Sequence, residues 1–294
     1  ALYRSVLPAE NLLLVNTPTR FNSETTKNLA RRLAENLEAP FVELPIDSFI
    51  NETVSQIDDL QIPFPSDMKT LHLTGFMKEN IQARDRSTRI LATLSSAFGG
   101  IFTCNANKTE LTVGYGTLYG DLSGALAATA DLWKHQIYAL GRTLNRYFDK
   151  NMIPDEIFTV RPSAELSENQ DITKGLGDPL IYEYHDFLFR SFIEPWNRIT
   201  PEEILTWYSK NCLEEKLGTP VSIKSIFKTH HDFITDLEKW WNLFAGFAVA
   251  KRIQAPPLLA VSRRPYGYDL RESQIAPYYT DTYIHLKNSL LSNG

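Results

Sequence analysis

The sequence has few cysteines and no long apolar runs. Cys104 and Cys212 are its two cysteines, and neither lies in a CxxC motif or has a histidine at metal-ligand spacing, which argues against a disulfide framework or a zinc site. No stretch approaches the roughly 18 apolar residues of a membrane-spanning helix. The N-terminus also lacks a basic segment followed by an apolar one and a cleavage site. We therefore expect a soluble protein that is not exported and that works in the reducing cytoplasm.

Excess positive charge is also lacking. Lysine and arginine number 30 against 35 aspartates and glutamates, which gives a formal net charge of −5. Because nucleic-acid-binding domains present a basic surface, nucleic acid is not an expected partner. Any anionic ligand has to be bound by a local basic patch. The 294 residues, 43% of them hydrophobic, are enough for one large domain, or a domain with an extension, and for a sizeable core.

Short apolar segments alternate with helical ones in the first part of the chain. Residues 12–15, 41–46 and 101–104 are apolar runs bounded by turn residues, as in buried parallel strands. Between them, the apolar spacing predicts helices over about 23–37 and 79–97. This alternation with short turns predicts an α/β fold with a doubly wound parallel sheet.

The rest of the chain is predicted to be mostly helical. Residues 131–149 have the apolar spacing of a long amphipathic helix, with Lys134 on its polar face. Another helix opens at Pro201, where proline and two acidic residues suit a first turn. We predict an α/β domain over residues 1–200 and a helical C-terminal part of the same domain over residues 201–294.

The segment from Asn107 to Asp121 carries the strongest functional signal. It reads NKTELTVGYGTLYGD and follows the third predicted strand directly. In open parallel sheets, ligands bind beyond the carboxyl ends of the strands, and glycines let the backbone approach a ligand closely. On composition alone, however, the glycines are turn residues and Glu110 is a solvated acid. The segment therefore needs support from elsewhere in the chain.

That support comes from a resemblance. The segment and the DLWK run at 131–134 resemble the signature of NAD synthetases, in which NKxE leads to GYxTxYGD and then DLxK. Three further blocks agree in order, namely NIQARDR at 80–86, RPSAEL at 161–166 and KRIQAPP at 251–257. Five ordered blocks are far more specific than one motif. The tryptophan-rich C-terminal third is similar to the long, glutamine-using form of the family. The resemblance implies a Rossmann-like fold of the adenine nucleotide α-hydrolase type.

The sequence departs from the family pattern at its start. The family's SGGxDS pyrophosphate loop follows a first strand, and here Ala1 to Arg4 would fall in the helix after that loop. The nitrilase-like glutaminase domain, with its Glu-Lys-Cys triad, is not in the sequence either. We expect a chain beginning at Ala1 to fold poorly or to be inactive, and an ordered structure to require preceding residues. Asn105 stands where the family usually has a threonine that contacts ATP.

The resemblance implies a two-step ligase reaction. ATP adenylates the nicotinate carboxylate of deamido-NAD and releases pyrophosphate, and glutamine-derived ammonia then attacks the adenylate to give NAD and AMP. Glu110 matches the family's ligand for Mg²⁺, a cation that prefers carboxylate oxygens. Lys134 matches the lysine that neutralises the ATP phosphates, and these two are the expected catalytic residues. Asn105 and Ser163 complete the expected ATP site.

The resemblance also implies a deamido-NAD site and self-association. The residues expected to bind deamido-NAD are Asn80, Arg84, Tyr115, Thr117, Asp121, Lys251 and Arg252. Arg86 is a candidate either for this site or for a structural ion pair. The family forms homodimers or larger homo-oligomers. Trp240 and Trp241 are expected to pack in the core or at such an interface, because basic residues hardly interleave with them.

Two other readings stay open. The chain could be another ligase of the ATP pyrophosphatase class that aminates a different substrate, although GYGTLYGD and KRIQAPP argue against it. It could also be an inactive nucleotide-binding or assembly fragment, because the pyrophosphate loop is not in the sequence. The adjacent pair His230 and His231 is not expected to bind a metal, since neighbouring side chains diverge on a helix or a strand.

Overall fold

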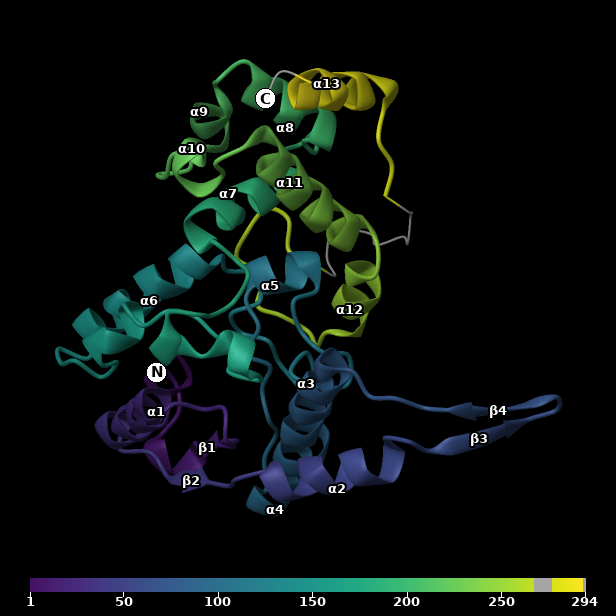
Figure 1. Cartoon of the computed structure of the whole chain (residues 1–294). Coiled ribbons are helices and arrows are strands. Elements are labelled where there is room, and N and C mark those ends of the chain that lie inside the picture. The colour runs from purple at the N-terminus through teal and green to yellow at the C-terminus, as the bar shows by residue number, and fades with distance from the viewer. Residues whose placement is uncertain (267–276, 293–294) are drawn as a thin grey trace. The chain divides into compact units, whose positions relative to one another are not determined.

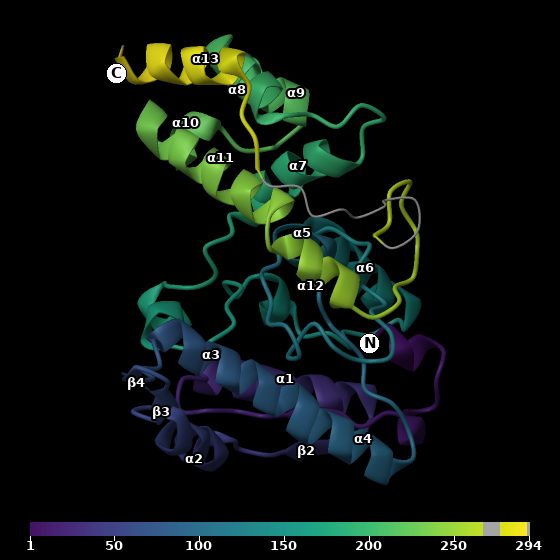
Figure 2. The ribbon, with the colours of Figure 1, turned by 90° about the vertical axis from the view of Figure 1, so that its right-hand side faces the viewer.

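A computed structural model describes residues 1–266 and 277–292, whose contacts form two compact units. Unit 1 comprises residues 1–102, 119–121 and 138–179, and unit 2 comprises residues 103–118, 122–137 and 180–294. Figures 1 and 2 show the ribbon from two sides. The predicted division at residue 200 stays a prediction. No helix among the described residues is long and apolar enough to cross a membrane.

Unit 1 begins with a parallel strand pair joined by a helix. After two short 3-10 turns, Tyr3–Ser5 and Ala9–Asn11, β1 (Leu14–Asn16) pairs in parallel with β2 (Phe41–Glu43), Val15 lying opposite Val42. The connecting helix α1 (Glu24–Leu37) starts where the Ser23 side chain accepts a hydrogen bond from the Thr26 amide. Both strands and the helix confirm the predictions for this region.

A hairpin and a long helical segment follow. They comprise α2 (Asp47–Ile57), the antiparallel strands β3 (Gln61–Phe64) and β4 (Asp67–Thr70), α3 (Gly75–Arg84), a π-helical stretch Asp85–Leu91 and α4 (Ala92–Phe98). The helix predicted over 79–97 is thus confirmed. Short 3-10 turns at Asp155–Phe158, Glu168–Gln170 and Ile172–Lys174 complete unit 1.

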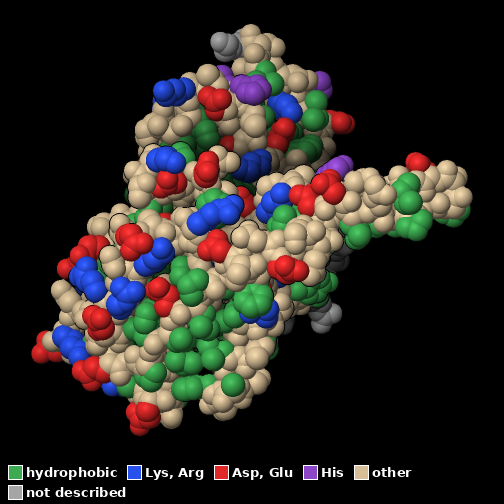
Figure 3. Space-filling model, turned by 60° about the horizontal axis from the view of Figure 1, so that its bottom comes forward, with side chains coloured by type: hydrophobic (Ala, Val, Ile, Leu, Met, Phe, Trp, Pro, Cys, Tyr) green, Lys and Arg blue, Asp and Glu red, His purple; other side chains and the backbone are tan. Residues whose placement is uncertain are grey.

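The β3–β4 hairpin extends away from α2 and α3 and exposes apolar side chains (Figures 1 and 3). Phe64 is 52% exposed and Met68 54%. Two strands alone are marginally stable in water, so the order of the hairpin depends on its base. There the backbones of Leu60 and Leu71 are hydrogen-bonded, and Lys78 pairs with Asp58 at 3.0 Å.

The prediction of a third strand at residues 101–104 is wrong. The amide of Cys104 donates one hydrogen bond to the carbonyl of Leu126, but no ladder continues from it in the described part of the chain. An apolar run becomes a strand only where a neighbouring strand pairs with it over several residues. Within the described ranges the structure contains two sheets of two strands each. The doubly wound parallel sheet is therefore not confirmed beyond the pair β1–β2.

Unit 2 is built from helices, as predicted for the C-terminal third. They are α5 (Lys108–Val113), the first turn of α6 (Lys134–Tyr147), α7 (Tyr182–Ile193), α8 (Pro201–Ser209), α9 (Leu213–Leu217), α10 (Ile223–Ile226), α11 (His230–Ala245), α12 (Ala248–Gln254) and α13 (Asp281–Ser292). The predicted helix 131–149 is thus observed as α6. Helix α8 begins at Pro201, with Thr200 and Glu203 forming a capping box.

The core of unit 2 gathers around α7 and α11. Trp240 and Phe244 of α11 pack on Phe189 and Phe192 of α7, with ring centroids 5.4–5.5 Å apart. Full burial of one such side chain stabilises a fold by about 1.5–3 kcal/mol. Trp240 is 1% exposed. It therefore belongs to the core of its own unit, the first of the two roles considered from the sequence.

Candidate functional site

The NKTE stretch forms the first turn of α5. Asn107 Oδ1 accepts a hydrogen bond from the Glu110 amide at 2.9 Å, and Glu110 Oε2 accepts one from the Asn107 amide at 3.0 Å. This reciprocal capping box satisfies two backbone donors at the helix start. One carboxylate oxygen of Glu110 is therefore part of the fold, and Oε1 remains for other contacts.

Helix α5 ends at a glycine that no other residue could replace easily. Gly114 has φ +65°, and a Cβ there would lie 2.9 Å from the Cα of Ala248. Both the left-handed backbone and the close approach of α12 require glycine. The first glycine of the GYG motif is thus explained by helix packing.

Lys134, at the start of α6, lies beside Glu110. Its Nζ is 3.9 Å from Glu110 Oε1 and 4.9 Å from the centroid of the Tyr182 ring. The Tyr182 hydroxyl lies 3.5 Å from the same Oε1. The side chains of Lys134 and Glu110 are each about one-fifth exposed. The two residues predicted to be catalytic are therefore neighbours, and both can be reached from solvent.

A buried aspartate of α7 ties the two helix starts together. Asp186 is fully buried and accepts hydrogen bonds from Thr109 Oγ1 at 2.5 Å and from the His135 amide at 2.9 Å. Its Oδ2 also lies 2.8 Å from Nδ1 of His135. Thr109 precedes Glu110 and His135 follows Lys134. By bonding to both neighbours, Asp186 keeps Glu110 and Lys134 close to each other.

A second buried pair anchors the same turn. Lys108 is fully buried, and its Nζ lies 2.8 Å from Asp131 Oδ1 and 2.7 Å from Ser262 Oγ. Burial alone would raise the pKa of Asp131, but hydrogen bonds from Lys108 and Ser262 lower it below its usual value. The pair is thus an ion pair, which is the form in which a buried lysine is tolerated.

The basic pair of the KRIQAPP block binds backbone within unit 2. Lys251 Nζ donates to the carbonyl oxygens of Gly114 and Gly116, both at 2.6 Å. Arg252 is 7% exposed and donates to the carbonyls of Thr112 and Phe244. Cations at the end of α5 suit the negative end of a helix. Their predicted contact with deamido-NAD stays a prediction.

The other predicted residues lie in both units. Asn105, Tyr115 and Thr117 belong to unit 2, and Asn80, Arg84, Asp121 and Ser163 belong to unit 1. Asn105, Arg84 and Asp121 are exposed, whereas Thr117 is buried. Asn80 donates to the Phe76 carbonyl at 2.8 Å, and Ser163 to the Gln170 carbonyl at 2.6 Å. Their roles in binding stay predictions.

Arg86, left open between two roles, is hydrogen-bonded in unit 1. It donates to the Thr17 carbonyl at 3.1 Å. Burial lowers the pKa of Arg86, and the charges of Asp121 and Asp85 oppose that shift. A guanidinium held in this way fixes the loop that follows β1.

Sequence reasoning missed several residues that build the site. Lys108, Thr109 and Asp131 lie within the quoted motifs, so their motif position was an available signal. Asp186 lies in an ordinary amphipathic pattern, 77 residues from Thr109, and had no such signal. Outside this site, Glu165 of the RPSAEL block in unit 1 was also missed; it is buried and accepts hydrogen bonds from the Ser23 amide and Thr26 Oγ1.

The fold is shared with a known class of structure. A glutamine-dependent NAD(+) synthetase from Cytophaga hutchinsonii superposes with a TM-score of 0.64 at 19% identity, over 95% of this chain and 40% of that one. This likeness shows that the two chains share a fold.

The family follows from the sequence comparisons. The model of the NAD synthase family matches residues 1–225, and the chain therefore belongs to this family. It is 33% identical over 198 residues to the glutamine-dependent NAD(+) synthetase of Thermotoga maritima, covering 67% of this chain and 32% of that protein. It is 31% identical over 213 residues to the NH(3)-dependent NAD(+) synthetase of Helicobacter hepaticus, covering 72% of each. The resemblance found in the five blocks is confirmed. The chain spans about a third of the length of its glutamine-dependent relative from Thermotoga.

Proposed function

We propose that this chain is the synthetase part of a glutamine-dependent NAD synthetase, a carbon–nitrogen ligase. In this proposal, ATP adenylates the nicotinate carboxylate of deamido-NAD, and ammonia then displaces AMP to give NAD. Ammonia would come from glutamine hydrolysed elsewhere in the full protein. The partners are therefore small molecules, and no nucleic acid or membrane is among them.

The observation that carries the proposal is the pairing of Glu110 with Lys134. The two residues come from different motif blocks, yet their charged atoms are 3.9 Å apart and partly exposed. Fully buried Lys108 and Asp186 lie beneath them and hold the two helix starts. Adenylation gathers negative charge on phosphates, and it is accelerated by cations held in fixed positions before the reaction. Lys134 would supply such a cation.

Glu110 fits a role as a Mg²⁺ ligand. Its Oε2 is used by the capping box, and Oε1 belongs to a side chain that is 19% exposed. Mg²⁺ commonly takes one or two protein carboxylates and fills its other positions with substrate phosphates and water. When bound, the ion would spread the charge of the leaving pyrophosphate. Glu110 would orient it, and Lys134 would neutralise an adjacent phosphate.

The remaining binding roles are proposed by motif position. Asn105 and Ser163 would contact ATP, and Asn80, Arg84, Tyr115, Thr117, Asp121, Lys251 and Arg252 would form the deamido-NAD site. Arg84 is an exposed residue, and a guanidinium is suited to binding a phosphate or carboxylate. Arg252 is buried against carbonyl oxygens, so it would act by holding the GYG loop.

Self-association is part of the same proposal. Homodimers or larger homo-oligomers would bury more than about 2,000 Å² per interface, the range of obligate complexes. Light scattering at micromolar concentration would then give at least twice the monomer mass. A monomer at that concentration would remove this part of the proposal and leave the proposed chemistry untouched.

The decisive experiment measures pyrophosphate release from ATP by the full-length gene product. We expect release that requires deamido-NAD, and formation of NAD that requires ammonia or glutamine. Release that needs a different carboxylate would favour another ligase of this class. Binding of ATP without turnover would favour a nucleotide-binding protein without catalytic activity. Glu183→Gln, at an exposed acid of α7, is the matched control for changes at Glu110.

A further inference from the structure

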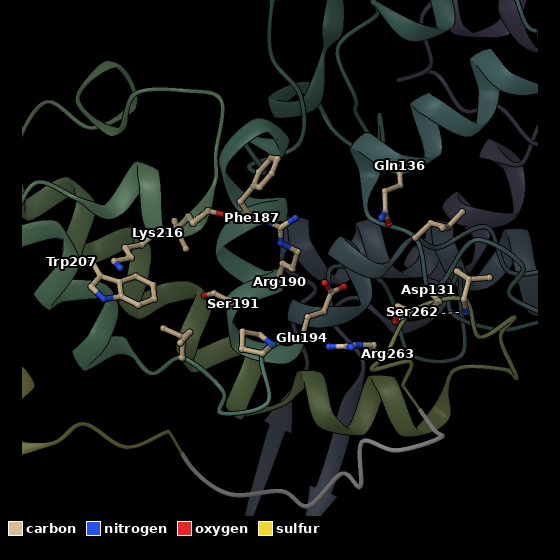
Figure 4. A pocket seen from close by; sticks show the side chains of 15 residues that line it. Asp131, Gln136, Phe187, Arg190, Ser191, Glu194, Trp207, Lys216, Ser262 and Arg263 are labelled. Carbon is tan, nitrogen blue, oxygen red and sulfur yellow. Dashed lines mark hydrogen bonds between the residues drawn. The ribbon is translucent and has the colours of Figure 1, made fainter.

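A cavity of about 620 Å³ lies in unit 2 (Figure 4). Its charged side chains do not converge on one point. Figure 4 shows Lys216 beside Trp207, whereas Arg263 lies towards Glu194. A ligand site needs polar groups that meet at the same ligand atoms, so the size of this cavity alone indicates no ligand.

Titratable side chains do converge at the base of the β3–β4 hairpin. Asp58 and Asp59 follow α2, and His72 follows β4. One carboxylate oxygen of each aspartate and one ring nitrogen of the histidine lie within 4.8 Å of one another. All three residues belong to unit 1, whereas Glu110 and Lys134 belong to unit 2. The cluster is therefore not part of the pair proposed for the synthetase reaction.

Hydrogen bonds of the backbone hold these three residues together. The Asp59 amide donates to the Leu71 carbonyl at 2.8 Å, and the Leu73 amide donates to Asp58 Oδ1 at 2.8 Å. His72 lies between Leu71 and Leu73 in the chain, so the two bonds keep it beside both aspartates. Asp59 has a φ of +66°, a conformation that aspartate and asparagine adopt more readily than most other residues. The fold of the hairpin base therefore fixes the arrangement of the cluster.

The distance between His72 and Asp59 suits ligands of one metal ion. Nδ1 of His72 lies 3.0 Å from Oδ1 of Asp59. Two ligand atoms that bind the same tetrahedral zinc ion, each at about 2.0–2.2 Å, are about 3.4 Å apart. Both side chains are more than two-thirds exposed, so small rotations about their side-chain bonds would open the pair to this distance.

The cluster already pairs with a cation of the protein. Lys78 Nζ lies 3.0 Å from Asp58 Oδ2. Hydrogen bonds from the Leu73 amide and from Lys78 hold the pKa of the Asp58 carboxyl below its usual value, so Asp58 is charged at neutral pH. Two carboxylates beside one ammonium leave one negative charge uncompensated. The Lys78 side chain is partly exposed and can turn into solvent, which would leave both carboxylates to a divalent ion.

We propose that Asp58, Asp59 and His72 bind a divalent transition-metal ion of the Zn²⁺ type, which joins the end of α2 to the end of β4. His72 ligates through Nδ1 with its proton on Nε2, each aspartate ligates through one oxygen, and water fills the remaining position. A nitrogen ligand beside carboxylates favours Zn²⁺ over Mg²⁺, which prefers oxygen ligands. The site contains no cysteine and no local histidine motif, so the sequence did not indicate it. It does not depend on the proposed synthetase chemistry.

Isothermal titration calorimetry of the protein with Zn²⁺, in the presence of excess Mg²⁺, tests the proposal. We expect binding with a Kd of about 10 μM or tighter. Asp59→Asn with His72→Gln should weaken it by about tenfold or more, and asparagine tolerates the backbone conformation of Asp59. Lys78→Gln should instead strengthen zinc binding by about threefold, because it removes the cation that competes for Asp58.

Matched controls show where the ion binds. Asp67→Asn with His285→Gln makes the same type of change at exposed residues outside the cluster, and should leave zinc binding unchanged. Glu110→Gln should leave it unchanged as well. Because two strands alone are marginally stable, hydrogen exchange of the amides at 60–72 should slow when Zn²⁺ binds, and should not slow in the Asp59 and His72 variant.

Three results would overturn the proposal. One is the absence of zinc binding with a Kd below about 1 mM, which would leave His72 and Asp59 as an ion pair only. Another is zinc binding that is unchanged in the Asp59 and His72 variant, since the ion would then lie elsewhere. The third is hydrogen exchange at 60–72 that does not slow on zinc binding, since the ion would then not join α2 to β4.

Discussion

Unit 2 and unit 1 keep their charged residues in different surroundings. The hydrophobic core cluster of the molecule lies within unit 2, and Lys108, Asp131 and Asp186 are buried in the same unit. Unit 1 has fewer large buried side chains. In unit 1, Arg32 and Glu156 form an ion pair in which each side chain is about half exposed.

This difference determines what each charge does. A buried charge without its partner is strongly destabilising, whereas an exposed pair contributes little. The charges beneath Glu110 and Lys134 are of the first kind. The geometry of the candidate site therefore depends on the packing of unit 2, and substitutions there should affect stability and activity more than similar ones in unit 1.

The largest effect is expected from Lys108→Met. Methionine fills a similar volume but leaves the Asp131 carboxylate buried without its cation, which should cost about 3–5 kcal/mol in the free energy of unfolding. Urea denaturation measures this loss. Arg32→Met removes a cation from the exposed pair of unit 1 and should change the midpoint little. Equal urea midpoints for Lys108→Met and Arg32→Met would contradict the expectation that buried charges in unit 2 matter more to stability than exposed charges in unit 1.

Glu110→Gln separates chemistry from folding. Glutamine can still accept from the Asn107 amide and keep the capping box, so the free energy of unfolding should change by less than about 0.5 kcal/mol. Adenylation should nevertheless fall by about a hundredfold or more, because the metal-binding charge is lost. Pyrophosphate release measured beside Glu183→Gln checks this. Near-normal turnover would remove Glu110 from the proposed site.

Lys251→Ala tests whether the basic pair does more than hold the GYG loop. Loss of its two hydrogen bonds to Gly114 and Gly116 should destabilise unit 2 by about 1–3 kcal/mol. If Lys251 also binds deamido-NAD, the substitution should raise the KM for deamido-NAD more than the KM for ATP. Steady-state kinetics with each substrate varied in turn measures both values. An equal rise in both would indicate general electrostatics instead.

Glu165→Gln probes a buried acid of unit 1. Three donors converge on this carboxylate, from Ser23, Asn22 and Thr26. Because the amide nitrogen of glutamine cannot accept a hydrogen bond, we expect a loss of about 1–2 kcal/mol. Glu168→Gln, at an exposed neighbour, is the control in the same denaturation experiment. A loss as large as that of Lys108→Met would mean that unit 1 is as sensitive as unit 2.

The smallest effect concerns pH and Asp171, a partly exposed acid of unit 1. Hydrogen bonds from Thr173 and Lys174 lower the pKa of Asp171 from 3.8 to about 2. Because the folded pKa lies below the unfolded one, the stabilisation is present above about pH 4 and is lost as the pH falls towards 2. The difference in unfolding free energy between the protein and Asp171→Asn should shrink over that window. A difference that stays constant between pH 4 and 2 would contradict the assignment.

Local signals made part of the fold predictable. Ser23 and the Thr200–Glu203 box mark helix starts through contacts within a few residues, and such contacts can be read from spacing alone. The apolar run at 101–104 led to a wrong strand prediction, because a strand forms only where another segment of the chain pairs with it. A pattern of apolar residues does not reveal whether that partner exists.

The sequence alone determined the family and the helix that carries Lys134, but it did not predict α5 or the capping box that orients Glu110. Only the tertiary structure revealed what holds that pair. Asp186 meets Thr109 across 77 residues, and Ser262 meets Asp131 across 131 residues. Such contacts form only when distant helices pack, and burial then turns ordinary polar residues into fixed parts of a site.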